Sequence, residues 1–474
     1  MQPKLDKDFI PAIVWTKKFL ETANSPIAIA VERENGLFYR YDTKIGDNQE
    51  NNKFYIERLI KMLLWSVGGF KIYIDNENLA KELADYYSDN GLRAFDKVTM
   101  ERIYEQKFEV VYTNDVPQTK DNPQAIGRKL GGNRIGFDAG GSDMKISAVK
   151  DGEVIFSDEI VWLPKLNDDP NYHYENIKNA IQIGIDKLGG KPDSIGISSA
   201  GVYVANRTMI ASLFIKIPKE QFDAKIKDIY INIAKEFGAP VAVANDGDVA
   251  ALAGSMCLEK NGVLGVAMGT SEAVGYVDQN GKITGWLNEL AFAPVDYNID
   301  RAPETSQRSG RFGIEERSPV ERTFDDEFSA KQATRACRDE WSGDFGVGCK
   351  YFSQDAVIKL APKAGIELSD DLTLAEKLKE VQKFAESGHE GALAIFETIG
   401  VYFGYAIAYY AEFYDINYLQ VLGRVTSGVG GDLIIENANK VLSEEFPELA
   451  KKVTLYVPDE YERRVGQSIA AASL

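Results

Sequence analysis

The segment RIGFDAGGSDMKISAV at residues 134–149 constrains the fold of this 474-residue chain more than any other. Apolar residues lead into and out of the pair Gly140-Gly141, which predicts a strand, a tight turn and a second strand. In the dinucleotide fingerprint and the P-loop, by contrast, the glycine turn leads into a helix. Glycines let backbone N–H groups approach phosphate oxygens, and Asp138 at the strand end can hold a hard cation. The alternative is a tight hairpin whose acid caps the turn, and this segment alone does not separate the two.

Three later segments also join an apolar strand to a turn of glycine or polar residues. In order they are 241–254, with Asn245 and Asp246 at the strand end; 263–277, with Gly269 and Thr270 in the turn; and 418–431, with Gly423 and Gly428. The four segments, in this order, resemble the phosphate-1, catalytic-acid, phosphate-2 and adenosine segments of the superfamily of actin, sugar kinases and heat-shock chaperone ATPases. They are most similar to the ROK family of sugar kinases and sugar-responsive repressors, over roughly residues 134–315 and 390–474.

The resemblance implies an α/β fold with a two-lobed, ribonuclease-H-like (actin-like ATPase) core and a cleft between the lobes. It also implies a carbohydrate kinase that uses ATP and magnesium to phosphorylate a hexose-like sugar hydroxyl. Such a transfer needs a cradle for the phosphates, a cation to neutralise them and a base for the hydroxyl. By resemblance, Asp246 is the base and Asp138 the magnesium residue. The residues implied in binding ATP and its phosphates are Gly140, Gly141, Ser142, Lys145, Gly269, Thr270, Ser271, Gly423, Arg424 and Gly428.

The pair Asn245-Asp246 has a second interpretation, because both residue types favour helix N-caps. Taken alone, the pair fits a helix cap better than a catalytic site. The two glycine turns in the correct order reverse that preference.

The predicted sugar pocket keeps its acids but loses the family's metal ligands. In the family, a Gly-Glu-x-Gly-His segment precedes a cysteine-rich zinc knuckle. Here Glu289 is kept, while Phe292 stands for the histidine and Ile314 for a cysteine, so we predict no zinc. Phe292 would offer an apolar or stacking surface, and carboxylates would accept hydrogen bonds from sugar hydroxyls. The predicted substrate-binding residues are Gly201, Asn245, Asp246, Glu289, Phe292 and Glu316.

Several departures from the family leave alternatives open. Glu289 and Glu316 could be solvated surface acids. Glu272 follows the second glycine turn, where a carboxylate would repel phosphates unless a cation bridges the two. A non-catalytic sugar or nucleotide sensor of the same fold, or an ATPase that acts on a protein partner, is therefore retained beside the kinase. Arginines between residues 301 and 317 suggest an anionic sugar, but the acids among them favour a charge-balanced surface.

Composition narrows the choice of partners. The net charge of −18 argues against nucleic acid, whose phosphate backbone demands a basic surface, and so against the repressor branch. Three cysteines without C-x-x-C spacing indicate neither a disulfide scaffold nor a zinc knuckle. No signal peptide is recognised at the N-terminus, and we predict a cytoplasmic protein. A small-molecule sugar is the expected partner, and a homodimer is possible because dimers are common in the family.

The stretch at 391–413 is long and apolar enough to span a membrane. No basic residue flanks it closely and it leads directly into the strand at 418–423, so we predict a buried core helix and no membrane contact. The expected organisation is an N-terminal α/β domain at 1–118, a linker at 119–133, a first lobe at 134–252 and a second lobe at 253–474. The second lobe would carry a helical insertion at about 316–390 and a C-terminal helix that returns to the first lobe.

Overall fold

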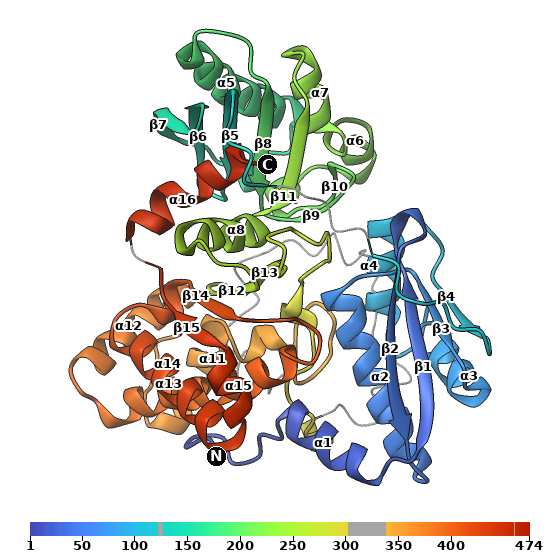
Figure 1. Cartoon of the computed structure of the whole chain (residues 1–474). Coiled ribbons are helices and arrows are strands. Elements are labelled where there is room, and N and C mark those ends of the chain that lie inside the picture. Colours follow the sequence, from blue (N-terminus) through green and yellow to red (C-terminus); the bar gives the residue numbers. More distant parts are fainter. Residues whose placement is uncertain (122–126, 302–337, 459) are drawn as a thin grey trace.

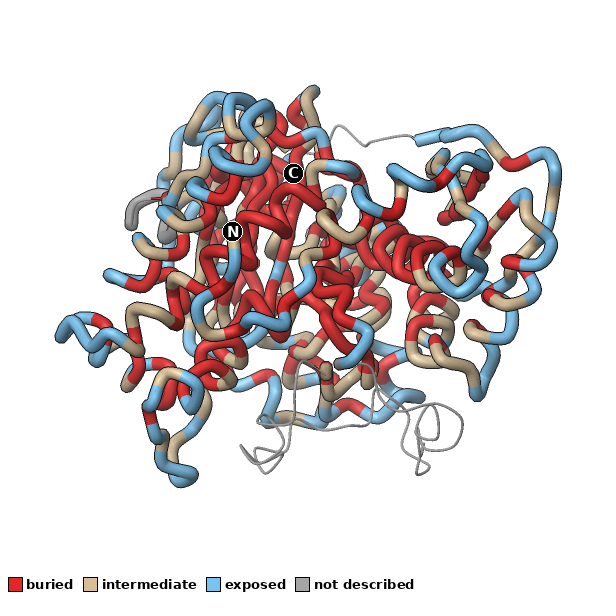
Figure 2. Tube along the Cα trace, turned by 90° about the horizontal axis from the view of Figure 1, so that it is seen from below, coloured by how far each residue is buried: buried red, intermediate tan, exposed pale blue. Residues whose placement is uncertain are grey.

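The computed structural model describes residues 1–121, 127–301, 338–458 and 460–474, and it contains three sheet-based parts. Figure 1 shows the first lobe at the top, the second lobe at the lower left and an N-terminal region, residues 1–121, at the lower right. The fold is α/β, with a two-lobed ribonuclease-H-like core beside the N-terminal region. Figure 2 shows that buried residues fill the interior, whereas exposed residues lie on the outer loops and helices.

The first lobe is built on a five-stranded sheet in the order β11-β8-β5-β6-β7. The central strands β5, β8 and β11 run parallel, while β6 and β7 continue as antiparallel neighbours of β5. The strands are β5 (Asn133–Ala139), β6 (Asp143–Lys150), β7 (Glu153–Val161), β8 (Ser194–Ser199) and β11 (Val241–Asn245). The helices in this part of the chain are α5 (Pro170–Leu188), α6 (Lys219–Gln221) and α7 (Ile229–Glu236).

The last helix, α16 (Glu460–Ala472), returns to pack against β5, β6 and β8. Two strand glycines permit this close approach. A Cβ at Gly136 would lie 2.0 Å from the carbonyl oxygen of Ser468, and one at Gly196 would lie 1.7 Å from that of Ala471. Since no side chain tolerates such distances, only glycine lets the helix backbone lie directly on these strands.

The second lobe has a four-stranded sheet in the order β13-β12-β14-β15. Strand β12 is antiparallel to β13 and parallel to β14, which is in turn parallel to β15. The strands are β12 (Val263–Met268), β13 (Glu272–Val277), β14 (Tyr418–Leu422) and β15 (Thr454–Tyr456). The helices are α8 (Asp246–Leu258), α11 (Gln354–Leu360), α12 (Leu374–Glu386), α13 (Glu390–Tyr410), α14 (Val429–Glu445) and α15 (Pro447–Lys452).

Helix α13 is the apolar stretch that met the length requirement for a membrane span. It packs against α1, α11, α12 and α14, and 78% of its most apolar window is buried inside the protein. A Cβ at Gly400 would lie 2.7 Å from the carbonyl oxygen of Ile434, so this glycine lets α14 pack closely. Among the described residues α13 alone has the length and hydropathy for a span, and its burial makes it a core helix, as predicted.

The N-terminal region has its own sheet, in the order β2-β1-β3-β4. Two of its elements, α1 and β2, were not expected from the sequence. The strands are β1 (Ser25–Glu32), β2 (Phe38–Ile45), β3 (Lys71–Ile74) and β4 (Glu109–Tyr112), and the helices are α1 (Ala12–Thr22), α2 (Gln49–Ser66), α3 (Glu77–Tyr86) and α4 (Ala94–Tyr104). The apolar side chains of this region form one continuous buried cluster with those of the second lobe, so the two parts share a core.

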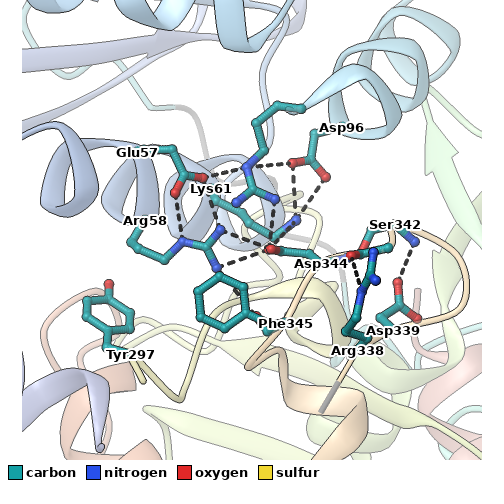
Figure 3. A network of polar contacts seen from close by, with 12 residues as sticks. Glu57, Arg58, Lys61, Asp96, Tyr297, Arg338, Asp339, Ser342, Asp344 and Phe345 are labelled. Carbon is teal, nitrogen blue, oxygen red and sulfur yellow. Dashed lines mark hydrogen bonds and ion pairs between the residues drawn. The ribbon is translucent and has the colours of Figure 1, made fainter. Parts of the chain in front are cut away.

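Buried ion pairs join α2 and α4 to the segment at 338–345, as Figure 3 shows around Asp344. The carboxylate of Asp344 lies 3.0 Å from Nη1 of Arg58 and 2.8 Å from Nη1 of Arg93. Lys61 pairs with Asp96 at 3.0 Å. The network balances three basic residues against three acids, listed together here: Arg58, Lys61, Arg93, Glu57, Asp96 and Asp344. Such balance is what allows charges to remain in a core.

Candidate functional site

Asp246 lies where the two lobes meet. It follows β11 of the first-lobe sheet and begins α8, which packs on β12 and β13 of the second lobe. Asn245 caps α8, since its Oδ1 accepts a hydrogen bond from the N–H of Gly247 at 2.7 Å, and its Nδ2 donates to the carbonyl oxygen of Gly201 at 2.7 Å. The capping interpretation of the pair is therefore correct for Asn245. Its amide also joins Gly201 to the start of α8.

Three further carboxyl groups surround Asp246. Asp138 ends β5, Asp248 lies in the first turn of α8, and Glu289 precedes a short 3-10 helix at Leu290–Phe292. Burial raises the pKa of Asp246, and it raises the pKa of Asp138 to about 6 and of Glu289 to about 7. The charge of Asp246 adds to both of these last shifts. Since like charges in a desolvated space oppose ionisation, this group is suited to bind a cation or hydroxyl donors.

The first glycine turn joins β5 to β6, as predicted from the sequence. Its backbone closes through a hydrogen bond from the N–H of Gly140 to the carbonyl oxygen of Asp143, at 2.9 Å. Gly141 and Ser142 are exposed. Lys145 stands opposite Asp138 in the strand register, and Oδ1 of Asp138 accepts a hydrogen bond from Oγ of Ser198 at 2.6 Å. The turn is thus accessible while the acid at its base is buried.

The second glycine turn joins β12 to β13 in the same way. The N–H of Gly269 donates to the carbonyl oxygen of Ser271 at 3.0 Å, and both Thr270 and Ser271 are exposed. A Cβ at Gly269 would meet nothing nearer than 3.8 Å. The backbone of this turn is therefore open to a ligand.

The predicted adenosine segment lies beside the second turn, because β14 pairs in parallel with β12 and the two strands end at the same edge. Gly423 has φ of 100°, and a Cβ there would lie 2.2 Å from the carbonyl oxygen of Met268, so this close approach requires glycine. Arg424 is exposed and begins the 3-10 helix at Arg424–Thr426, and Gly428 precedes α14. Ligands of open α/β sheets bind at this strand edge.

The side chain of Glu272 does not lie where the sequence suggested. It is 4% exposed, and its Oε1 accepts a hydrogen bond from the hydroxyl of Tyr410 at 3.2 Å. A Cβ at Gly348 would lie 2.1 Å from the other carboxyl oxygen. Burial raises the pKa of Glu272 to about 8, which favours the protonated, uncharged form of the group. The expected repulsion of phosphates by Glu272 is therefore wrong: the strand turns its side chain into the core, beneath the exposed turn.

Phe292, at the family's histidine position, contacts the N-terminal region. Its ring centroid lies 4.4 Å from that of Trp65 in α2 and 5.5 Å from that of Phe95 in α4. This packing accounts for an aromatic residue at the position without any ligand. The predicted substrate residue Glu316, like Ile314, lies outside the described residues.

Sequence reasoning missed Asp248. Its Oδ1 accepts hydrogen bonds from Nδ2 of Asn288 at 2.8 Å and from the N–H of Tyr276 at 3.0 Å. Burial raises its pKa to about 7. The only available signal was an acid two positions after Asp246, and such an acid is common in the first turn of any helix.

No preformed cluster of three or more His, Cys, Asp or Glu residues suitable for a metal occurs in the described part of the chain. Asp138 still fits magnesium, since that ion keeps several waters and is usually held by one or two carboxylates together with substrate phosphates.

The fold of the chain is similar to that of solved structures at low sequence identity, among them a hexokinase and a transcriptional regulator. A ROK hexokinase from Thermus thermophilus has a TM-score of 0.50 and 14% identity, and the match covers 72% of this chain and 97% of that one. A ROK family transcriptional regulator, a homologue of the E. coli MLC protein, has a TM-score of 0.52 and 15% identity, with 73% and 78% covered. The chain has the ROK fold. Because this fold serves a kinase and a regulator alike, the fold alone does not choose between these functions. No protein-family model and no curated protein matches the sequence.

Proposed function

We propose that this protein transfers a phosphoryl group from ATP to a hydroxyl of a hexose-like sugar, with Asp246 as the general base. The observation that carries the proposal is the position of Asp246 between the lobes, near enough to Asp138 and to Glu289 for its charge to raise the pKa of each. Two exposed glycine turns, one in each lobe, accompany it. The proposal implies work in the cytoplasm, where ATP is available.

Each residue near Asp246 has a role that follows from its contacts. Burial raises the pKa of Asp246, which makes its carboxylate a stronger base than an ordinary aspartate. Asn245 holds the start of α8 to Gly201 and so fixes the direction of the Asp246 carboxylate. Glu289 is half-buried and offers carboxylate oxygens to sugar hydroxyls.

The phosphates of ATP would lie between the two turns. The backbone at Gly140, Gly141 and Ser142 would approach them from the first lobe, and that at Gly269, Thr270 and Ser271 from the second. The adenosine would lie near Gly423, Arg424 and Gly428. Asp138 would hold magnesium, with Lys145 opposite, and the ion would neutralise charge on the phosphates. Burial raises the pKa of Asp138 to about 6, and this supports the assignment because a bound cation would offset the cost of ionising a desolvated carboxylate.

A sensor that binds the sugar without turnover is the second candidate. It is favoured by the regulator among the structural neighbours and by the packing of Phe292 against Trp65, which replaces a polar residue of the sugar site with an apolar contact.

The experiment that tests the proposal is ADP release with ATP and magnesium against a panel of hexoses, N-acetylhexosamines and acidic sugars. We expect sugar-dependent turnover that falls by about 10²- to 10⁴-fold in Asp246→Asn. The matched control is Asp169→Asn, which alters an N-cap aspartate of α5 that accepts from the N–H of Asn171 at 2.9 Å. This control should keep its turnover.

Three results would overturn the proposal. If Asp246→Asn keeps the turnover of the wild type, Asp246 is not the general base. ATP hydrolysis that ignores sugar would indicate an ATPase. Sugar-dependent thermal stabilisation without any ADP release would indicate the sensor.

A further inference from the structure

The two walls of the candidate sugar site belong to different lobes, and the N-terminal region contacts both. Glu289 stands on the second-lobe wall. Gly201 stands on the first-lobe wall, directly before the hairpin of β9 (Val202–Val204) and β10 (Arg207–Ile210). Helix α4 packs against both strands of this hairpin, and Figure 1 shows it where the N-terminal region lies next to the first lobe.

On the second-lobe wall, the end of α2 binds the backbone that carries Glu289. The N–H of Glu289 donates to the carbonyl oxygen of Trp65 at 2.8 Å, and that of Asn288 donates to Ser66 at 2.9 Å. The last carbonyl groups of a helix lack partners within the helix, so this segment satisfies them. The ring of Phe292, tilted by 34° against that of Trp65, adds an apolar contact three residues after Glu289.

On the first-lobe wall, Glu105 makes the polar contact. It caps the end of α4 in the left-handed conformation, with φ of 53°. Its carboxylate lies 2.6 Å from Nη1 of Arg207 and 2.8 Å from Nζ of Lys227. Both hydrogen bonds lower the pKa of Glu105, and the one from Lys227 has the larger effect. Arg207 also pairs with Asp228 at 2.9 Å.

A cation–π contact and a buried apolar contact accompany the ion pairs. The guanidinium of Arg102 lies 5.3 Å from the ring centroid of Phe222, and Val202 belongs to the buried cluster shared by the N-terminal region and the second lobe. The polar contact on the first-lobe side is more open to solvent than the continuous core on the second-lobe side, since Glu105 and Arg207 are 43% and 36% exposed. Exposed ion pairs contribute little and are screened by salt.

We propose that the N-terminal region braces the candidate sugar site, with Trp65 positioning the Glu289 wall and Glu105 positioning the Gly201 hairpin, and that the brace releases at Glu105. Its effect on catalysis rests on the proposed function, but the brace itself does not. Because the N-terminal region contacts both lobes, it limits how far the two walls of the site can separate. Closure of the lobes is the step that completes such sites and excludes water.

Hydrogen exchange of the backbone at 202–210, without sugar or ATP, tests the brace independently of any activity. We expect Glu105→Gln to increase exchange there by about two- to fivefold, the effect of losing exposed ion pairs. Raising sodium chloride from about 0.1 to about 1 M should also increase exchange at 202–210 in the wild type, because the screening length falls from about 10 to about 3 Å. The same change in salt should have little effect on exchange in Glu105→Gln, which has already lost the charge. The matched control Glu77→Gln removes an exposed pair with Lys81 inside α3 and should leave 202–210 unchanged.

Equal exchange at 202–210 in the wild type and Glu105→Gln, or an equal change in Glu77→Gln, would overturn the brace. If a sugar is turned over, Glu105→Gln should raise KM by a similar factor with kcat nearly unchanged, because the walls are displaced and the base is not. If exchange at 202–210 increases in Glu105→Gln but the protein turns over no sugar, the brace is supported and the proposed kinase activity is rejected.

Discussion

Oδ1 of Asp248 accepts a hydrogen bond from Nδ2 of Asn288 at 2.8 Å, which joins the helix that begins at Asp246 to the residue before Glu289. The hydroxyl of Tyr414 donates a hydrogen bond to Oδ1 of Asn288 at 3.0 Å. Asn288 adopts the left-handed conformation, with φ of 54°. The two bonds hold it there, so the relative position of the proposed base and the proposed sugar acid depends on Asp248.

Replacing Asp248 by alanine should destabilise the protein by about 1–3 kcal/mol for each group it leaves unsatisfied, namely the N–H of Tyr276 and the amide of Asn288. Asp248→Asn keeps an accepting oxygen and should cost less than about 1 kcal/mol. Urea unfolding at pH 6 measures both. Equal costs for the two variants would show that the hydrogen bonds do not matter.

Sugar binding should strengthen as pH rises through about 7. Burial and the charges of Asp246 and Asp248 raise the pKa of Glu289 to about 7, and its ionised form accepts hydroxyl hydrogen bonds best. In Asp246→Asn one neighbouring charge is lost, so the midpoint of the binding curve should move to lower pH. Calorimetric titration measures this without turnover. If the pH midpoint of sugar binding is the same in Asp246→Asn and the wild type, the charge of Asp246 does not affect the ionisation of Glu289.

Glu272→Gln should become more stable than the wild type at high pH. The folded state raises the pKa of Glu272 from 4.5 to about 8, so its protonated form contributes stability that is complete below about 4.5 and lost as pH rises through about 8. Glutamine carries no charge at any pH. The Tm values should therefore agree near pH 4.5 and differ by several degrees, in favour of the variant, at pH 9. If the difference in Tm between the two proteins is the same at every pH, folding does not raise the pKa of Glu272 and its carboxylate is ionised in the folded protein.

Asp344→Ala should destabilise the protein by about 3–5 kcal/mol, because it removes a carboxylate shared by Arg58 and Arg93 and leaves three buried basic residues against two acids. Thermal or urea unfolding measures the loss, beside Glu77→Gln, whose exposed pair should be worth less than about 1 kcal/mol. If both substitutions cost the same, water reaches the network around Asp344.

The strand–turn–strand segments were predictable because they rest on short-range patterns. Apolar alternation around Gly140 and Gly269 specifies two hairpins, and both occur at the expected residues. The burial of the helix at Glu390–Tyr410 also followed from its flanking sequence. Even Asn245 satisfied a local rule, since its capping bond spans two residues.

The rest depended on partners that are distant along the chain. The carboxylate of Glu272 is the same whether it faces a phosphate or Tyr410. Because Tyr410 is 138 positions further along the chain, no local pattern shows which of the two it faces. Asp344 meets Arg58 across 286 positions, and Phe292 meets Trp65 from another sheet-based part of the protein. The sequence by itself determined the four segments and their order, because backbone propensity and glycine chemistry act over a few residues. Only the tertiary structure decided which charges are buried and which walls are joined, because desolvation and pairing depend on what surrounds a side chain in space.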